Sequence, residues 1–423
     1  NIATANQSLQ QQVRKYQQLP KAHIGMVKNA YATGNTQLTK MADKVNQLSG
    51  TFQILPDFLG SDQPRTYALM AMTTSEERSS GGLIGSVGVV TTDNGKISIG
   101  DFRSNGEYIP YGAGDPTEDE QRIFRQWGPL NMSFDVRDLA VYPDTSRSAE
   151  GMRAIWQRTP WGSNTQLDGV LMVDPVFLQE LTKISGNVTI PDGTVLTGDN
   201  TAEFLLNKVY VDYPVSMQDA LFAQVAEQTV GSMFSNVDLT KLTKVAQLMG
   251  SMAEGRHFSM YAFDETAEKT ISDAGFTAQT PSSEEHPQVG VYVTEQNPSK
   301  MGWYIHRTSK VTRSTCGNDG SQTYHVEYKM TNTLENSQIG ALTSYILGSG
   351  GQGVEKTLIY APAGGSISNL KTSGGSVTES RQETLNGKTV YASNATIAPG
   401  ESVTYSFDVT TSTKAVSDLT IDQ

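Results

Sequence analysis

The fold of this chain is decided by residues 66–99, TYALMAMTTSEERSSGGLIGSVGVVTTDNGKISI. The stretch opens with TYALMAM, a nearly continuous apolar run that is typical of a buried strand. It ends with two strand-like runs around Asp93-Asn94-Gly95, a turn sequence that is a strong hairpin signal. The polar cluster EERSSGG, residues 76–82, stands between them. Its charges and glycines therefore mark one end of an apolar strand.

Strands and helices alternate after this stretch. The pattern predicts a helix over 146–158, a buried strand over 167–174 and a helix from Pro175, since proline suits a first helical turn. Two long helices, a further strand and a capped helix follow. Alternation of this kind predicts a central sheet with helices on its faces, so we assign residues 54–285 to an α/β core.

Two regions of different composition flank this core. Residues 1–53 are typical of an N-terminal helical segment, a hairpin of two helices broken near Pro20. Residues 286–423 lose the helical period and carry short runs rich in Val, Thr, Tyr and Ser, which predict a C-terminal antiparallel β-sandwich. Because the sequence begins on a polar run without Met, we expect an export signal or membrane anchor to precede it.

The composition restricts the classes of function. A net charge of −12 argues against nucleic-acid binding, which needs a basic face. The single cysteine, Cys316, rules out an internal disulfide framework, and the five histidines lack metal-site spacing, so no metal site is predicted. The sequence has no GxSxG, Walker A or strand-to-helix GxGxxG motif that would mark a nucleophile or a nucleotide site.

Arginines dominate the basic residues in the first half of the predicted core. Between residues 65 and 158 there are nine arginines and one lysine, and arginine binds phosphate or carboxylate with a planar fork. Internal salt bridges are the alternative interpretation. Arg78 and Arg103 each follow a predicted strand, and ligands of open α/β sheets bind at the carboxyl ends of strands. We expect both arginines to share one rim and to hold an anionic group there.

Neighbouring residues complete this predicted site. Glu77 is the candidate general acid or base. Gly81 and Gly82 would let backbone amides approach a ligand closely, because they lack a Cβ atom.

Asp144 and Arg147 form a second candidate position, at the start of the helix predicted over 146–158. Asp144 is expected to cap the free amides of that helix. The alternative is an anion site made by the helix N-terminus and Arg147. Carboxylates such as Glu77 and Asp144 could also pair as in a glycoside hydrolase, which requires a separation that the sequence does not define.

Several motifs together resemble a bacterial family of unknown function. They are ERSSGG at 77–82, VYPDTSRSAEGMRAIW at 141–156 and LDGVLMVDPVFLQELTKISGNVTIP at 167–191. In this combination the sequence resembles the domain-of-unknown-function family numbered 4012, over about residues 1–420. The resemblance implies an N-terminal membrane helix and a position on the extracellular face of the bacterial membrane.

More distantly, the core is similar to the LytR-CpsA-Psr phosphotransferases, which attach polyprenyl-pyrophosphate-linked glycopolymers to peptidoglycan. That family's Arg-Ser-Asp and Pro-Arg-Asp motifs fall at RSS (78–80) and FRS (102–104), so the resemblance places Arg78, Ser79 and Arg103 at the ligand. Both motif aspartates are serine here. Magnesium binding and a pyrophosphate clamp therefore do not follow from the resemblance, and the cofactor stays unknown.

The resulting hypothesis is a cell-surface, wall-associated protein that binds a glycan or a polyprenyl-pyrophosphate-linked glycan. Transfer of the polysaccharide to the cell wall would be its enzymatic form. The alternatives are a non-enzymatic scaffold for extracellular polysaccharide assembly and a glycoside hydrolase.

Overall fold

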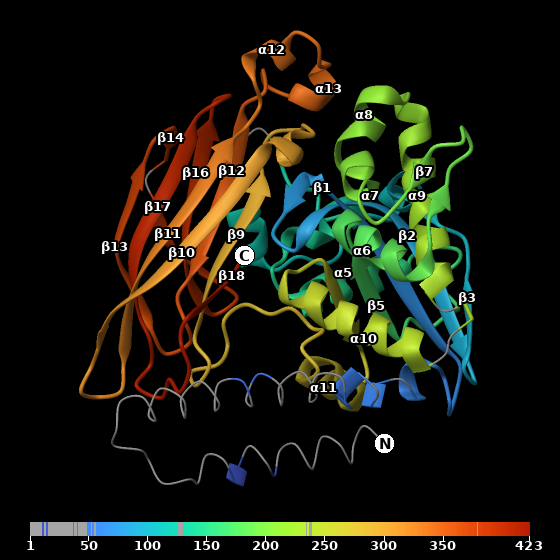
Figure 1. Ribbon diagram of the computed structural model, residues 1–423, viewed down its shortest axis with the longest axis horizontal. Coiled ribbons are helices and arrows are strands. Elements are labelled where there is room, and N and C mark those ends of the chain that lie inside the picture. The colour runs from blue at the N-terminus through green and yellow to red at the C-terminus, as the bar shows by residue number, and fades with distance from the viewer. Residues whose placement is uncertain are drawn as a thin grey trace.

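The chain forms two bodies that lie side by side, a mixed α/β region and a body made of strands (Figure 1). The computed structural model describes residues 56–125, 130–233, 235–236, 239–378 and 380–423, and isolated positions between 11 and 54. Apart from those isolated positions, the N-terminal helical hairpin predicted over 1–53 lies outside the described residues.

A mixed sheet forms the centre of the α/β region. Its strands are β1 (Arg65–Arg78), β2 (Gly81–Asp93), β3 (Lys96–Ile99), β4 (Arg103–Ser104), β5 (Gly169–Val173) and β8 (Phe258–Ala262). The order is β3-β2-β1-β5-β8, with β4 paired to β2. β1 runs parallel to β5, and the other neighbouring pairs are antiparallel. The predicted central sheet is therefore confirmed, with mainly antiparallel pairing.

The stretch over 66–99 lies in the middle of this sheet. Successive residues of β1 enter two different apolar clusters, with Leu69 on one face and Met70 on the other. Burial on both faces explains why TYALMAM is apolar throughout. Asn94 and Gly95 have φ angles of 46° and 83°, which matches the primed turns that join hairpin strands. The buried strand and the hairpin predicted from the sequence are both confirmed.

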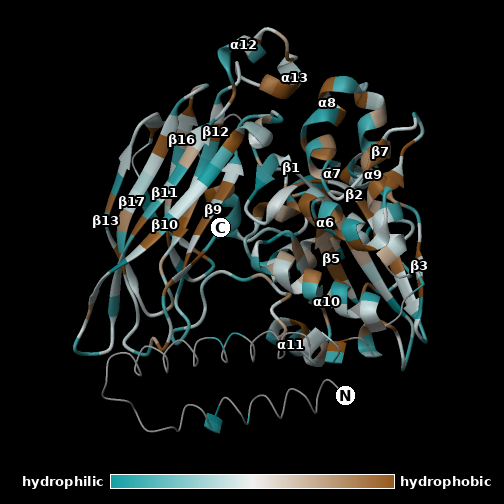
Figure 2. Cartoon of the chain, viewed as in Figure 1, coloured by the Kyte–Doolittle hydropathy of each residue, from teal (hydrophilic) through white to brown (hydrophobic). Residues whose placement is uncertain are grey.

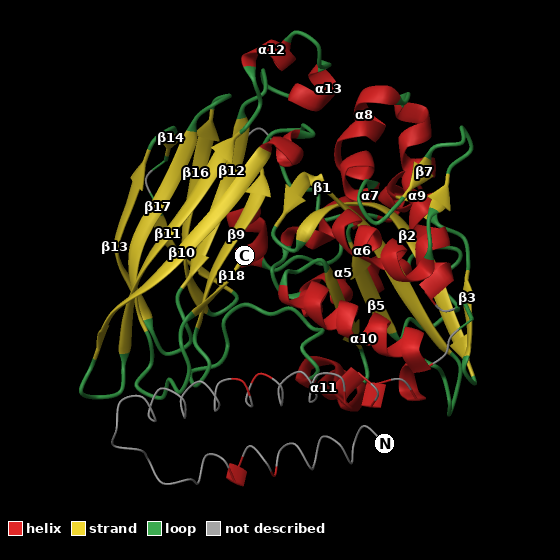
Figure 3. Ribbon diagram, viewed as in Figure 1, coloured by secondary structure: helices red, strands yellow, loops and turns green. Residues whose placement is uncertain are grey.

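Helices cover both faces of the sheet (Figure 3). The helices of this region are α3 (Asn105–Tyr108), α4 (Glu118–Phe124), α5 (Thr145–Trp156), α6 (Pro175–Ser185), α7 (Thr201–Glu203), α8 (Val209–Asp212), α9 (Val215–Met233), α10 (Leu239–Glu254) and α11 (Glu265–Asp273). α6, α9 and α10 pack on the face that carries Leu69, and α5 packs on the other. Between α7 and α8 the helix widens into a π-helical turn, Phe204–Lys208.

The C-terminal body consists of two sheets around one apolar core. One sheet contains β10 (Ile305–Cys316), β11 (Gln322–Asn332), β17 (Ser402–Thr410) and β13 (Ser366–Ser373), in that order. The other contains β14 (Ser376–Val377), β16 (Lys388–Ile397), β12 (Gly353–Tyr360), β9 (Gln288–Glu295) and β18 (Thr420–Asp422), with β15 (Arg381–Leu385) paired to β16. The pairs are antiparallel except that β18 runs parallel to β9, so the C-terminal strand differs from the expected all-antiparallel sandwich.

The two bodies share apolar surface. Tyr292 of β9 and Leu358 of β12 belong to the same cluster as Met70 of the central sheet. Two short helices, α12 (Asn336–Ile339) and α13 (Ser344–Leu347), project beyond one end of the sandwich, and α13 carries hydrophobic residues (Figure 2). Ile346 of α13 packs with Met301 in a separate small cluster. This end of the junction contains the pocket described below.

Candidate functional site

The EERSSGG cluster, residues 76–82, connects the central sheet to the sandwich. Its first charges pair across the junction, Glu76 with Lys300 and Glu77 with Arg307, the latter with 2.6 Å between oxygen and nitrogen. The Ser79 hydroxyl lies 3.2 Å from that of Thr294 on β9. The residues in this cluster therefore form internal contacts between the two bodies.

Arg78 and Arg103 do not share a rim, so that expectation is wrong. Arg78 is opposite Gly81 on β2, whereas Arg103 is opposite Val87 on the same strand. Six residues of β2 separate these two positions, which corresponds to roughly 20 Å along an extended strand. The two arginines therefore lie at different places along the sheet.

Each of these two arginines has an internal partner. Two nitrogens of the buried Arg78 donate to one carboxylate oxygen of Asp138, at 2.9 and 3.1 Å. Burial alone would raise the pKa of Asp138, but Arg78 and hydrogen bonds from Ser133 outweigh it and lower that pKa. Arg103 lies over the Trp161 ring at 4.3 Å and pairs with Glu107. The internal salt bridges considered as the alternative are thus what the structure contains.

Gly81 and Gly82 make room for β1 and not for a ligand. A Cβ on Gly82 would lie 1.9 Å from the carbonyl oxygen of Thr73, and one on Gly81 would lie 2.9 Å from the Met72 side chain. Gly81 also has a φ of 139°, which side chains rarely adopt. The expected approach of backbone amides to a ligand is replaced by close packing of two strands.

Glu77 belongs to a buried group of carboxylates at the junction. Its neighbours Glu295 and Glu355 stand opposite each other on β9 and β12, and both are fully enclosed. Burial, together with Glu355, raises the pKa of Glu77 to about 7, although Arg307 opposes the shift. A perturbed pKa suits a general acid or base, but Glu77 is paired with Arg307 and does not line the pocket described below.

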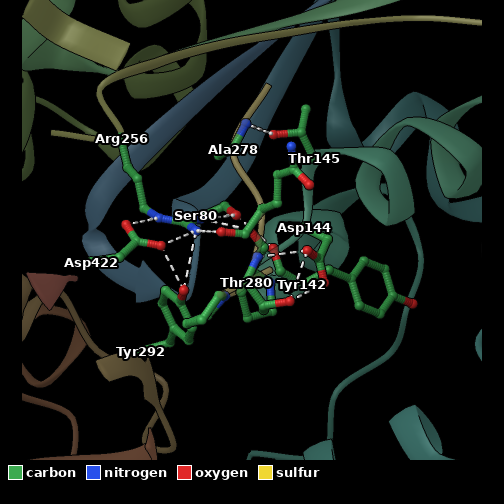
Figure 4. Close-up of polar contacts among 12 residues, drawn as sticks. Ser80, Tyr142, Asp144, Thr145, Arg256, Ala278, Thr280, Tyr292 and Asp422 are labelled. Carbon is green, nitrogen blue, oxygen red and sulfur yellow. Dashed lines mark hydrogen bonds and ion pairs between the residues drawn. The ribbon is translucent and has the colours of Figure 1, made fainter. Parts of the chain in front are cut away.

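Asp144 and Arg147 also form internal contacts. The Asp144 side chain accepts hydrogen bonds from the amide and hydroxyl of Thr280, at 2.7 and 3.1 Å, and makes no capping bond to α5 (Figure 4). Asp144 is thus at the predicted N-cap position of α5, but its carboxylate binds the segment after α11 and not the free amides of the helix. Arg147 forms a two-pronged pair with the buried Glu120, at 2.8 and 2.9 Å.

Arg256 stands at the centre of the closed part of the junction (Figure 4). Its guanidinium pairs with both oxygens of Asp422, at 2.7 and 2.8 Å, and donates to the Pro143 carbonyl at 2.6 Å. It also lies over the Tyr292 ring, at 4.7 Å. Asp422 ends β18, so the C-terminal strand is held to the α/β region by this buried cation.

A pocket of about 210 Å³ opens at the other end of the same junction. Four separate parts of the chain contribute to it: the β1–β2 hairpin, α3, the α8–α9 region and, from the C-terminal body, Lys300 together with Tyr345 of α13. Its lining residues are Thr73, Glu76, Leu83, Gly85, Asn105, Val209, Tyr210, Gln218, Asp219, Phe222, Lys300 and Tyr345. Glu76 is the only residue of the EERSSGG cluster among them.

Lys300 supplies the pocket's positive charge. Its ammonium lies 5.0 Å from the ring centre of Tyr210 and 4.9 Å from that of Tyr345, and it pairs with Glu76. Two aromatic faces and one carboxylate therefore surround it. Burial lowers the pKa of Lys300 to about 7.

Tyr210 owes its position to the π-helical turn that precedes it. The wider turn over Phe204–Lys208 shifts the following residues, and such turns are frequent at functional sites. The Tyr210 hydroxyl bonds to Thr73 at 2.9 Å on β1. Burial raises the pKa of Tyr210 to about 12, so the phenol keeps its proton at neutral pH.

Gln218 and Asp219 supply acceptors to the pocket. Gln218 is 4% exposed; its amide nitrogen donates to the Tyr213 carbonyl at 3.0 Å, while its Oε1 has no hydrogen-bond partner among the described residues. Asp219 is exposed at the surface; desolvation by its surroundings raises its pKa, with no cation of the described residues countering the shift. Neither residue was singled out from the sequence, because no local motif distinguishes them from other residues of an amphipathic helix.

Two kinds of feature are absent from the described part of the chain. No group of three or more His, Cys, Asp or Glu side chains is arranged there to hold a metal ion. None of the helices in that part is both long and apolar enough to span a bilayer.

Residues 62–210, from β1 to the start of α8, match the family model described as "Protein of unknown function (DUF4012)". The predicted family is confirmed for this segment. The DUF4012 segment contains the EERSSGG cluster and ends at Tyr210, whereas Lys300 and Tyr345 lie outside it. No curated protein matches the chain.

Two solved structures are similar in part. The transcriptional regulator yvhJ from Bacillus subtilis has 13% identity and a TM-score of 0.26, covering 51% of this chain and 78% of its own. The Lin1025 protein from Listeria innocua has 9% identity and a TM-score of 0.23, covering 53% and 85%. Scores this low support no conclusion about fold or function, and the resemblance to LytR-CpsA-Psr enzymes stays a prediction.

Proposed function

We propose that this protein binds a glycan and holds one sugar residue in the pocket between Tyr210 and Tyr345. The proposal rests on one observation: a small pocket at the junction combines two aromatic rings with the unpartnered, buried Oε1 of Gln218. A buried acceptor without a partner is costly, and a ligand hydroxyl would satisfy it.

The chemistry of the lining suits a sugar better than an apolar ligand. Sugar rings carry hydroxyl donors around an apolar face, and the pocket offers acceptors on Gln218 and Asp219 beside the tyrosine rings. A volume of about 210 Å³ is below the usual range for drug-sized ligands, which favours a single ring. The rest of a polysaccharide would extend outside the pocket.

The binding form of the hypothesis is favoured over transfer or hydrolysis. The transfer hypothesis places the anionic pyrophosphate at Arg78 and Arg103. These residues pair with positions on β2 that are roughly 20 Å apart along the strand. The hydrolysis hypothesis makes Glu77 the general acid or base, but Glu77 forms an ion pair with Arg307. A non-enzymatic role in extracellular polysaccharide assembly at the bacterial surface agrees best with a pocket of this kind, and its cell-surface placement rests on the family resemblance alone.

Calorimetric titration of the full chain with tetrasaccharides of glucose, N-acetylglucosamine and glucosamine tests the proposal. We expect at least one to bind, and Tyr345→Ala to weaken its binding about tenfold, because a stacked ring contributes about 1.4 kcal/mol. Tyr345→Phe, which keeps the ring, is the matched control and should retain most of the affinity. If none of the three binds, or if Tyr345→Ala binds as the parent does, the pocket is not a glycan site.

A further inference from the structure

We propose that the pocket selects a sugar carrying a free primary ammonium group, an amino sugar, whose cation pairs with Asp219. This inference rests on the proposed glycan-binding function and names the class of sugar that the site prefers.

The charges that line the pocket do not cancel. The lining residues with acidic or basic side chains are Glu76, Asp219 and Lys300. Glu76 and Lys300 neutralise each other through their ion pair. Asp219 lies near both rings: burial raises the pKa of Tyr345 and of Tyr210, and the charge of Asp219 adds to both shifts. One negative charge therefore remains available at the mouth of the pocket.

Hydrogen-bonding capacity in the pocket has the same bias. Gln218 presents its carbonyl oxygen because its amide nitrogen is already bonded to the Tyr213 carbonyl, at 3.0 Å. The amide of Asn105 donates to the carbonyl of Ile84, at 3.1 Å, so this donor is also occupied. The unpartnered oxygen of Gln218 and the carboxylate of Asp219 can accept donors from a ligand, while the Lys300 ammonium is paired with Glu76. An ammonium group supplies three donors together with the missing positive charge.

Other sugars fit this arrangement less well. A carboxylated sugar would bring a second negative charge next to Asp219, where like charges repel. A neutral or N-acetylated sugar would satisfy Gln218 but would leave Asp219 without a counter-ion. The aromatic rings serve all of these sugars equally, so they do not set the choice between them.

The test compares four tetrasaccharides on the full chain at about pH 6, which is above the ordinary pKa of Asp and Glu carboxyls. They are oligomers of glucosamine, N-acetylglucosamine, glucose and glucuronic acid. We expect glucosamine to bind at least tenfold more tightly than N-acetylglucosamine, and glucuronic acid to bind most weakly. Asp219→Asn should remove most of the glucosamine preference.

Because the whole chain carries a net charge of −12, any cationic oligomer is attracted to it. Asp199→Asn is the matched control, since Asp199 is exposed and does not line the pocket. It should keep the preference intact. Equal binding of glucosamine and N-acetylglucosamine, or equal losses in both variants, would overturn the amino-sugar inference and leave glycan binding standing. If no oligomer binds, the proposed function itself fails.

Discussion

Arg256 and Lys300 are two buried cations at the same junction, but their surroundings differ. All three guanidinium nitrogens of Arg256 donate hydrogen bonds, to Asp422, to carbonyls and to hydroxyls. Lys300 has one carboxylate partner, Glu76, and two aromatic faces, and a cavity of about 210 Å³ adjoins it. One cation is enclosed by the protein, whereas the other borders open space.

The difference separates a structural site from a binding site. A charge that is fully paired inside a protein holds elements together and has no capacity left for a ligand. Space beside a partly satisfied group, with further acceptors such as Gln218 nearby, is what a ligand can fill. Burial and charge alone do not make this distinction, because Arg256 and Lys300 are both 7% exposed.

Arg256→Met should give the largest effect, because it leaves the carboxylate of Asp422 without its cation. Breaking one side of a buried pair typically costs about 3 to 5 kcal/mol. We expect a loss of that size in the free energy of unfolding, measured by urea denaturation of the full chain. The β18 strand should be the first element to lose protection in amide hydrogen exchange, since Asp422 ends it.

Arg103→Met is the matched control, because Arg103 also combines an aromatic face with a carboxylate. Its side chain is 31% exposed, so its pair with Glu107 is screened by water. The expected cost is about 0.5 to 1 kcal/mol. Equal losses for the two substitutions would mean that enclosure does not set the strength of these contacts.

Glu355→Gln probes the buried carboxylates on β9 and β12. Burial raises the pKa of Glu355, and burial together with the Glu355 charge raises the pKa of Glu295. The other charged groups that face them are Glu77, Arg307 and Arg78. A raised pKa in the folded state means that the native protein holds protons which the unfolded chain releases. Stability from these groups is therefore present below about pH 4.5 and is lost as pH rises through the folded-state values.

Removing one charge from this group should stabilise the protein at high pH. We expect Glu355→Gln to raise the free energy of unfolding by about 1 to 3 kcal/mol at pH 8, with the gain shrinking toward pH 5. Urea denaturation across that range measures it. Glu327→Gln, on the exposed side of β11, is the control and should show no such dependence. A loss of stability at pH 8 would show that ionised Glu355 is needed by Arg307.

Local patterns predicted much of the fold from the sequence. The apolar run of β1, the Asn94-Gly95 turn and the capped helix α11 are each determined by neighbouring residues, and each lies where it was predicted. The short strands of the sandwich were also recognisable from composition. The parallel β18 strand was not predicted, because its pairing with β9 depends on the ion pair between Asp422 and Arg256.

Register and long-range contacts explain the failure at the site. Arg78 and Arg103 were predicted to follow strands, but Arg78 is the last residue of β1 and Arg103 begins β4, which pairs with the middle of β2 and not with its end. Register shifts in β1, between Ala71 and Met72 and between Thr73 and Glu77, also change which side chains meet. The pocket residues come from segments that no local pattern connects, so only the folded chain brings Glu76 to Lys300.

Lys300→Met should have the smallest effect on stability, although it too removes one partner of an ion pair. Glu76, the residue left behind, is 16% exposed and lines a cavity that water can enter, so its carboxylate can be hydrated. Methionine also fills the space between the tyrosine rings with an apolar side chain of similar length. We expect the free energy of unfolding, measured by urea denaturation, to change by less than about 1 kcal/mol. A loss of about 3 kcal/mol or more would show that Lys300 is as enclosed as Arg256, and the pocket would then belong to the closed junction. The geometry predicts that the stability changes little. It also predicts that glucosamine oligomers still bind, or bind more tightly because the charge of Glu76 is freed. Both results together would show that Lys300, unlike Arg256, borders a binding site.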